Sequence, residues 1–264
     1  MEHGIEVGEI VARERFAEQL SVQAGSIIRR YYYGGTARTE TKSDGSPVTD
    51  ADRDAERFLR NRINDAFPHD SVLGEEYGEQ AGDNDWKWIL DPIDGTKSFV
   101  TGVPLFTVLI AVVRDGAPQL GVIHNPITNE TVSASIGNGC RFNGAPTSVR
   151  PCDDLAGAMV LTTDPAELAR RRPNYSRALT ETAGSIRTWA DGYGYLLVAT
   201  GRADAMIDPI VQPWDVAPLY PVITEAGGIL TDCDGNRSQE SLATSALAAT
   251  PGVHRALLNL AHER

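Results

Sequence analysis

The sequence predicts an α/β fold in which layers of helix and sheet alternate, and three observations support this prediction. Near the N-terminus, apolar residues recur three and four apart, which is the period of a helix with one buried face. From residue 86 to 135, short apolar segments lie between turn signals and are typical of strands. Beyond residue 150, short strands alternate with helical stretches, so we expect helices to cover the sheets in layers.

Two helices are predicted before residue 70. The apolar stripe of the first runs from residue 16 to 31, and a glycine pair that begins at Gly34 ends it. The second begins at Thr49, whose hydroxyl can cap the chain while Asp52 reaches back to it. Its apolar stripe stops before Pro68, a residue that cannot continue a helix.

The middle of the chain is predicted to be sheet, because turn signals such as Asn143-Gly144 separate its apolar segments. The expected strands lie at 86–90, 106–113, 119–124, 130–135, 158–162, 205–208 and 228–232. Later helices are expected at 175–183, 193–200, 215–226 and 251–262. The pattern favours two halves, residues 1–150 and 151–264, with a boundary near residues 145 to 155.

Charge and composition exclude several classes of function. The 264 residues carry 24 basic and 36 acidic side chains, a net charge of −12, and nucleic acid repels such a polyanion. The longest apolar run, 103–113, is too short for a membrane span, which needs about 20 residues. The three cysteines are scattered and predict neither a disulfide framework nor a zinc cluster. The acidic N-terminus does not have the pattern of a secretory signal. We expect a cytoplasmic protein that binds neither nucleic acid nor membrane.

Carboxylates gather where predicted strands end. Glu75 and Glu76 follow a short apolar step, and Asp91 and Asp94 follow the strand at 86–90. Acids that are buried close together repel one another and lose hydration, so a cation is needed to neutralise them. Oxygen ligands suit Mg²⁺, Mn²⁺ or Ca²⁺ better than Zn²⁺.

The segment Asp91-Pro92-Ile93-Asp94-Gly95-Thr96 has the residues that would shape such a site. Its proline restrains one φ angle and its glycine permits a sharp turn, so the two aspartates and the Ile93 carbonyl can converge. Gly95 and Thr96 also begin a predicted helix, whose free N–H groups would bind an anion beside the metal. A metal next to an anion site predicts a phosphate ester as the substrate.

Each acidic segment is ambiguous when it is taken alone. The pattern D-x-x-D-G is most often an Asx-turn, and two adjacent glutamates are often part of a solvated loop. Asp215 can equally be the N-cap of the helix expected at 215–226. The functional interpretation therefore depends on the joint occurrence of these segments.

Together the segments resemble the inositol monophosphatase superfamily of metal-dependent, lithium-sensitive phosphatases. The resemblance covers nearly the whole chain and is carried by Gly74-Glu75-Glu76, Asp91-Pro92-Ile93-Asp94-Gly95-Thr96, Trp214-Asp215-Val216-Ala217 and Glu225-Ala226-Gly227-Gly228, with Lys42, Ser46-Pro47-Val48-Thr49 and Asp52 nearer the N-terminus. It implies a layered α/β/α/β/α sandwich of the inositol monophosphatase and fructose-1,6-bisphosphatase type, usually a homodimer.

The resemblance also implies roles for individual residues. Two or three Mg²⁺ ions, with Mn²⁺ as an alternative, would be ligated by Glu75, Asp91, the Ile93 carbonyl, Asp94 and Asp215. Thr96 and Glu75 would orient the attacking water, Gly95 and Thr96 would bind the phosphate, and Asp52 and Lys42 would lie in the outer part of the metal site. Two neighbouring cations can bind the phosphate and stabilise charge on the leaving oxygen.

The segment from Trp189 to Tyr195 indicates the substrate. Inositol phosphatases typically carry a small neutral segment at this place, whereas Asp191 is an acid between aromatic residues. The segment resembles that of the superfamily's histidinol-phosphate phosphatases. Their substrate bears an ammonium and an imidazole, which Asp191 and Asp208 would bind while Tyr193 or Tyr195 offers a stacking surface. The expected substrate contacts are Asp191, Gly192, Tyr193, Asp208 and Asp215.

Several alternatives remain open. Inositol monophosphate, fructose 1,6-bisphosphate and 3′-phosphoadenosine nucleotides are substrates of related phosphatases, and the two tyrosines can equally be core residues. A non-catalytic calcium-binding module is the alternative from another class. The segment 232–236 resembles a calcium loop superficially, but its glycine comes too early for an EF-hand.

Overall fold

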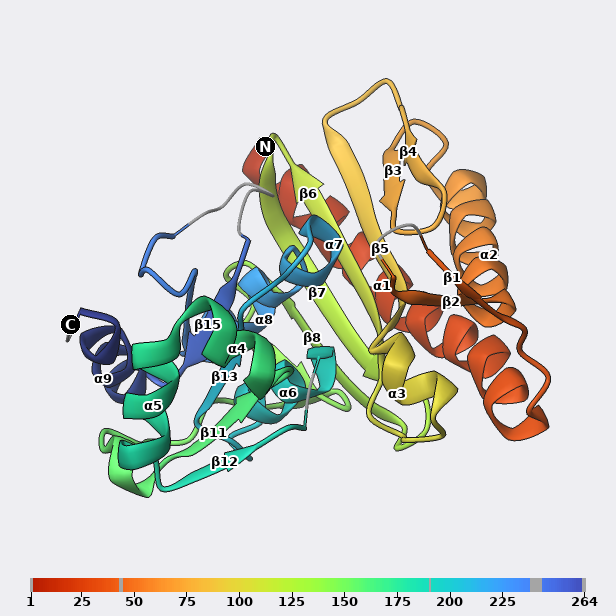
Figure 1. Cartoon of the computed structure of the whole chain (residues 1–264). Helices are drawn as coiled ribbons and strands as arrows, with labels where there is room; N and C mark the ends of the chain where they lie inside the picture. Colours follow the sequence, from red (N-terminus) through yellow and green to blue (C-terminus); the bar gives the residue numbers. More distant parts are fainter. Residues whose placement is uncertain (1, 43–44, 190, 238–243, 263–264) are drawn as a thin grey trace.

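The computed structural model describes residues 2–42, 45–189, 191–237 and 244–262 of the chain (Figure 1). Helices and sheets alternate in five layers, so the predicted α/β/α/β/α sandwich is confirmed. The first layer consists of α1 (Glu2–Gly34) and α2 (Asp50–Ala66), which lie along one face of the larger sheet. Thr49 is the N-cap of α2, and Asp52 completes the capping box that its spacing predicts.

The second layer is an eight-stranded sheet. In spatial order its strands are β10 (Ala145–Pro146), β9 (Cys140–Phe142), β8 (Glu130–Ser135), β7 (Ala117–Asn125), β6 (Thr107–Arg114), β5 (Trp86–Asp94), β3 (Ser71–Gly74) and β4 (Gly78–Gln80). Only β3 and β5 run parallel, and the other neighbouring strands are antiparallel. A separate pair, β1 (Thr39–Thr41) and β2 (Pro47–Thr49), precedes α2.

The remaining three layers are built mainly from the second part of the chain. A five-stranded sheet has the order β12 (Ser185–Arg187), β11 (Met159–Thr162), β13 (Ala205–Asp208), β15 (Ala246–Ala249) and β14 (Ile229–Thr231). Between the two sheets lie α6 (Asp191–Ala199), α7 (Pro213–Val216) and α8 (Leu219–Glu225), while the outer face carries α4 (Pro165–Arg171), α5 (Pro173–Thr182) and α9 (Pro251–His262). The short α3 (Thr96–Val100) directly follows β5, and a 3₁₀ turn (Leu155–Gly157) precedes β11.

The alternation of side chains along each strand divides the apolar residues between the layers. On β6, Val108 and Ile110 pack in the cluster with α1 and α2, whereas Leu109 packs in the cluster with α6 and α8. Met206 of β13 faces the same middle layer as Leu109, and its neighbour Ile207 faces the outer helices. The middle layer therefore lies between two apolar sheet faces, and the strand ends that border it carry the candidate site.

The predicted single helix over 215–226 is wrong, because the structure has two short helices there. Pro218, which has no N–H to donate, ends the α7 segment and is the N-cap of α8. Asp215 is also not an N-cap: that position belongs to Gln212, whose N–H donates to the Asp215 carboxylate at 2.7 Å. The proline positions are the physical reason for both corrections.

Other predicted elements are present with altered bounds, and several short ones had no clear sequence signal. The strands β1 to β4, β9, β10, β12 and β15 were not expected, because elements of two to four residues are too short to show a period. The helix α4, of seven residues, was not expected either. The change from one sheet to the other falls between residues 146 and 159, while the division into two halves stays a prediction. No helix among the described residues is long and apolar enough to cross a membrane.

Candidate metal and phosphate site

A β-bulge in β5 brings two aspartates to the same face of the sheet. Asp91 pairs with Leu109 of β6, but Asp94 pairs with Thr107. An advance of three residues along β5 therefore corresponds to an advance of only two residues along β6. In a regular strand, residues three apart point to opposite faces, and the extra residue of a bulge reverses this. Both carboxylates consequently face the middle layer. The sequence placed these residues in a loop after residue 90, whereas the strand continues through them to Asp94.

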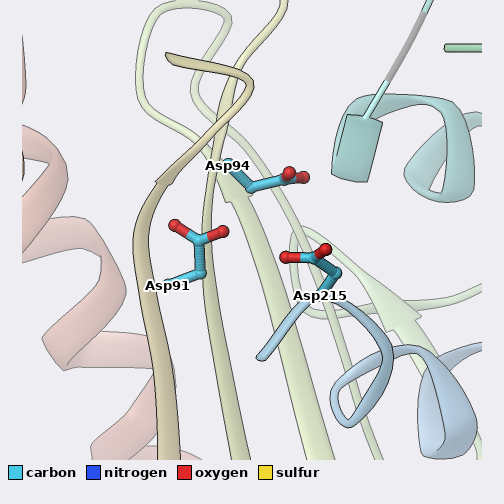
Figure 2. Close-up of side chains that lie close together, drawn as sticks. All are labelled: Asp91, Asp94 and Asp215. Carbon is cyan, nitrogen blue, oxygen red and sulfur yellow. The ribbon is translucent and has the colours of Figure 1, made fainter. Parts of the chain in front are cut away.

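A third aspartate reaches the same point from a distant part of the chain. Asp215 lies on α7, and Figure 2 shows its side chain directed toward Asp91 and Asp94. One carboxylate oxygen from each of the three lies within 4.8 Å of the others. Opposite ligands of one Mg²⁺ are about 4 Å apart. The spacing is therefore that of oxygens that share one ion or two neighbouring ions.

The three carboxylates carry an unfavourable charge density. Burial raises the pKa of Asp91 and Asp94, and the charges of nearby acids raise it further. Burial likewise raises the pKa of Asp215 to about 7, although the N–H of Gln212 opposes the shift. No ion pair joins any of the three to a lysine, arginine or histidine in the described part of the chain. A hard divalent cation fits this donor set, because it would supply the missing positive charge.

Glu75 borders the cluster but faces a lysine. It follows β3, and its N–H donates to the Leu90 carbonyl of β5 at 3.2 Å, beside the parallel strand that leads to Asp91. Its carboxylate accepts a 2.6 Å bond from Lys42, which also donates to Glu76 at 2.7 Å. The charge and hydrogen bonding of Glu75 also raise the pKa of Asp91. Glu75 thus lies beside Asp91, but it pairs with Lys42 and is not one of the three carboxylates that meet at one point.

Asp52 lies behind these glutamates with one oxygen unpaired. Its Oδ2 accepts bonds from the N–H and the hydroxyl of Thr49, at 2.8 and 2.6 Å, while Oδ1 is buried with no hydrogen-bond partner among the described residues. Burial raises the pKa of Asp52 to about 7, and the charges of Glu76 and Glu75 add to the increase. An unpaired buried carboxylate oxygen fits the outer cation site that the family resemblance implies for Asp52 and Lys42.

The residues after the bulge form the start of α3. Gly95 has a φ of 89°, which is the left-handed region that glycine adopts without strain, and it is the N-cap of this helix. The Thr96 hydroxyl donates to the Ile93 carbonyl at 3.0 Å, and the Ile93 N–H donates to Asp91 at 3.0 Å. The structure therefore places Ile93, Gly95 and Thr96 directly beside the aspartate cluster.

Gly192 joins the start of α6 to the aspartate cluster at the end of β5. Its N–H donates to the Asp94 carboxylate, which the Thr107 hydroxyl also approaches at 3.4 Å. A β-carbon on Gly192 would overlap the Thr107 hydroxyl and lie 2.6 Å from Asp94 Oδ2. Gly192 accordingly has a packing role that the sequence did not indicate, namely close approach of α6 to the end of β5.

We expect Gly192→Ala to reduce phosphatase activity about 10²-fold, because the added methyl would move Asp94 or α6 by a distance that reactions of this kind do not tolerate. Steady-state kinetics with saturating Mg²⁺ would measure the loss. Gly157→Ala is the matched control, since a β-carbon there meets nothing within 4 Å. Equal activities of the two variants would contradict the role assigned to Gly192.

Asp191 and Asp208 lie next to the cluster, in a second group of acids. Asp191 has a φ of 55°, an uncommon backbone for a residue other than glycine, and its N–H approaches the Thr163 hydroxyl at 3.4 Å. That hydroxyl donates to Asp208 at 3.0 Å. Burial raises the pKa of Asp191 to about 6, against the opposing charge of Lys97. Burial and the Asp191 charge raise the pKa of Asp208 to about 8.

The two tyrosines of this segment have different environments. The Tyr193 hydroxyl donates to Glu130 at 3.1 Å, and its ring packs against the core of the middle layer. Its hydroxyl is therefore bonded to Glu130 and not to Asp191 or Asp208. This placement does not support the substrate contact expected of Tyr193. Tyr195 is only 2% exposed and is influenced by the charges of Asp208, Asp94 and Asp215. Trp189, at the start of the same segment, is exposed.

Sequence reasoning missed Thr163, Thr107 and Glu56. Thr163 directly follows β11, which pairs with β13 and ends beside the site. Its position after a predicted strand was the one sequence feature that could have indicated a site residue. Glu56 accepts the N–H groups of Glu76 and Tyr77, at 2.7 and 3.2 Å, and thereby holds the turn after β3. No sequence signal distinguished Glu56 from the other acids of the predicted helix.

Comparisons with known proteins identify the family and the fold that this chain shares. Residues 12–264 match the model of the inositol monophosphatase family. A histidinol-phosphatase of Chlorobaculum parvum is 40% identical over 225 residues, which are 85% of this chain and 87% of that protein. The crystal structure of extragenic suppressor protein suhB from Bartonella henselae has a TM-score of 0.90 at 28% identity, over 96% of this chain and 99% of that chain. The Thermotoga maritima IMPase has a TM-score of 0.87 at 28% identity, over 96% and 97%.

Proposed function

This chain belongs to the inositol monophosphatase family, and we propose that within it the chain hydrolyses histidinol phosphate with Mg²⁺. Its general activity is that of a phosphomonoester hydrolase, as the family and the histidinol-phosphatase relative show. The narrower proposal depends on one observation: two further acids, Asp191 and Asp208, lie next to the three-aspartate cluster. The hydroxyls of a neutral polyol could donate hydrogen bonds to these acids, whereas a substrate with two basic groups would also neutralise their charge.

The ions would be held by Asp91, Asp94 and Asp215, with Glu75 and the Ile93 carbonyl as further ligands and Asp52 at the outer position. When bound, Mg²⁺ would polarise the phosphate and lower the pKa of a bound water. Manganese would suit the same oxygen donors. Lys42 donates to both Glu75 and Glu76, and these hydrogen bonds outweigh the effect of burial and raise the pKa of Lys42, so it would remain a cation beside the two carboxylates.

The chain's own residues would position the reacting groups. Thr96 borders the cluster through the Ile93 carbonyl, and Glu75 borders it through Asp91, so the two can accept and donate hydrogen bonds to one attacking water. Backbone N–H groups that follow Gly95 would bind the phosphate oxygens. In-line displacement by water needs no covalent intermediate on the protein.

The charge of Asp191 should determine which ester is preferred. We expect Asp191→Asn to lower kcat/KM for histidinol phosphate about 10- to 10²-fold, the worth of a charge-assisted hydrogen bond, with little change for inositol 1-phosphate. Phosphate release from both esters by the wild type and the variant would measure this. A wild type that prefers inositol 1-phosphate, or a variant that loses activity on both esters equally, would contradict the proposed substrate.

Inositol 1-phosphate is the second candidate substrate, because the chain shares its fold over nearly its whole length with the Thermotoga maritima IMPase. The same assay decides between the two esters. The phosphatase relative argues against a non-catalytic calcium module. Homodimer formation, lithium sensitivity, cytoplasmic location and the expected lack of nucleic-acid and membrane partners remain predictions.

A further inference from the structure

A buried carboxylate on α2 holds the turn between β3 and β4. The side chain of Glu56 has no exposed surface, and its Oε2 accepts the Glu76 N–H at 2.7 Å while Oε1 accepts the Tyr77 N–H at 3.2 Å. Arg60, one turn later on the same helix, donates to Oε1 at 2.7 Å. A charge that is buried with such partners is held firmly in one place, because the loss of any of them would leave it uncompensated.

This Glu56–Arg60 clamp contacts both ends of the turn. Gly74 ends β3 and pairs with Gly78 of β4. Arg60 donates to the Gly78 carbonyl. At the other end, a β-carbon on Gly74 would overlap Glu56 Oε1 and lie 2.9 Å from Arg60 Nη2. Glycine at position 74 therefore lets the clamp lie directly against the backbone of the turn.

The clamp restrains the backbone that carries Glu75. The Glu75 N–H donates to the Leu90 carbonyl at 3.2 Å, and the next two N–H groups of the chain donate to Glu56. With three consecutive N–H groups engaged, the direction of the Glu75 Cα–Cβ bond is restrained. The carboxylate itself, which lies beside Asp91 and bonds to Lys42, keeps its rotatable side-chain bonds. The clamp therefore sets the range that the Glu75 carboxylate can reach.

Helix α2 also brings Asp52 to the same region. Asp52 and Glu56 are four residues apart, so they lie on the same face of the helix. Oδ1 of Asp52 is buried without a partner in the described part of the chain, and the charges of Glu75 and Glu76 act on this carboxyl group. One face of α2 thus offers an unpaired acid oxygen and, one turn later, an acid that is bound to the turn.

These contacts assign a role to the clamp in cation binding. Resting on the proposed Mg²⁺-dependent hydrolysis, we propose that Glu56 is a positioning residue, which holds Glu75 where its carboxylate reaches a cation bound at the aspartate cluster. Glu56 acts through the backbone of the turn and not by contact with the cation or the ester. A carboxylate is required, because both of its oxygens must accept N–H groups, whereas a glutamine would turn its own NH₂ group toward one of these donors.

Glu56→Gln is expected to weaken the binding of divalent cations about tenfold and to lower kcat about 10- to 10²-fold, the range found when a group that orients a metal ligand is removed. KM for the ester should hardly change, because the residues expected to contact the ester are kept. Mn²⁺ binding to the substrate-free protein, measured by electron paramagnetic resonance of the free ion, reports the affinity without turnover. Phosphate release from histidinol phosphate and from inositol 1-phosphate at increasing Mg²⁺ gives kcat and KM.

Asp70→Asn is the matched control for a defect that is only structural. Asp70 directly precedes β3, at the end of the strand opposite to Glu75, is 3% exposed and accepts two 3.0 Å bonds from Arg13. This substitution likewise places an NH₂ group against buried donors, so both variants should have a lower Tm than the wild type. Only Glu56→Gln should change the affinity for Mn²⁺.

Gly74→Ala displaces the clamp by another route, because the added methyl overlaps Glu56 while every charge is kept. It should weaken Mn²⁺ binding as Glu56→Gln does, and it takes the place of that variant if the latter does not fold. Wild-type Mn²⁺ affinity in either folded variant, or an equal loss of affinity in Glu56→Gln and Asp70→Asn, would overturn the inference. A wild type that binds no divalent cation, or that releases phosphate equally well without one, would instead overturn the proposed function, so the two failures are distinct.

Discussion

Asp91→Asn is expected to lower the phosphatase activity by a factor of at least about 10³ while the fold remains intact. This factor is equivalent to about 4 kcal/mol of transition-state stabilisation. Asparagine has nearly the same shape, and its Oδ1 can still accept the Ile93 N–H. What disappears is one negative charge from the centre of the aspartate cluster, so the affinity for divalent cations falls. Phosphate release at increasing Mg²⁺ would measure both effects.

A second readout makes this prediction specific. Without divalent cations, Asp91→Asn should be as stable as the wild type or more so, because it removes a buried charge whose neighbours repel it. Addition of Mg²⁺ should raise the Tm of the wild type and hardly change that of the variant. Asp65→Asn, at an exposed position on α2, is the control and should behave like the wild type. Wild-type turnover by Asp91→Asn at saturating Mg²⁺ would refute the site.

Removal of divalent cations should make the stability of the protein strongly dependent on pH. The pKa values of Asp191, Asp215 and Asp208, raised to about 6, 7 and 8, exceed the usual unfolded value of about 4. Between pH 4 and 8 the folded chain therefore holds more protons than the unfolded chain, and stability falls as pH rises. Below about pH 4 these groups are protonated in both the folded and the unfolded state, so they do not lower the free energy of unfolding.

Mg²⁺ should reverse this loss, because it binds the ionised carboxylates. We expect the difference in Tm with and without Mg²⁺ to be small at pH 5 and to exceed about 5 °C at pH 8, since the destabilisation amounts to several kcal/mol. Thermal unfolding in EDTA and in Mg²⁺ across this range would test it. Asp94→Asn should flatten the pH dependence in EDTA. A metal-free wild type that is most stable at pH 8 would show that the acids are not buried together.

The layered fold and the acidic segments of the candidate site could be predicted because their signals are local. The capping box at Thr49 and the glycine at 95 depend on residues within one turn of each other, and both occur where the sequence indicates. The two short helices after residue 212 could not be bounded, because two prolines there lie within an otherwise helical pattern. Short strands such as β3 and β4 were missed, because three or four residues are too few to show the alternation of apolar and polar residues.

Relations across the fold were less predictable. Tyr193 and Tyr195 are two residues apart on α6, so they point in different directions, and only the packing of α6 between the sheets determines which one lies near Asp208. The sequence could not indicate that Glu130 engages the first of them. The pairing of Lys42 with both Glu75 and Glu76 likewise depends on the position of β1 and β2 beside the turn after β3.

The amino-acid sequence by itself determined the chemical composition of the candidate site: which carboxylates end which strands, and hence the prediction of an oxygen-ligand cation site suited to a phosphate ester. Tertiary structure alone decided how these groups meet. A bulge of one residue turns Asp91 and Asp94 to the same face, and α7 brings Asp215 to them from 121 positions along the chain beyond Asp94. Side-chain direction in a sheet reverses with every residue, so such convergence follows from the register of strand pairing, which no local pattern encodes.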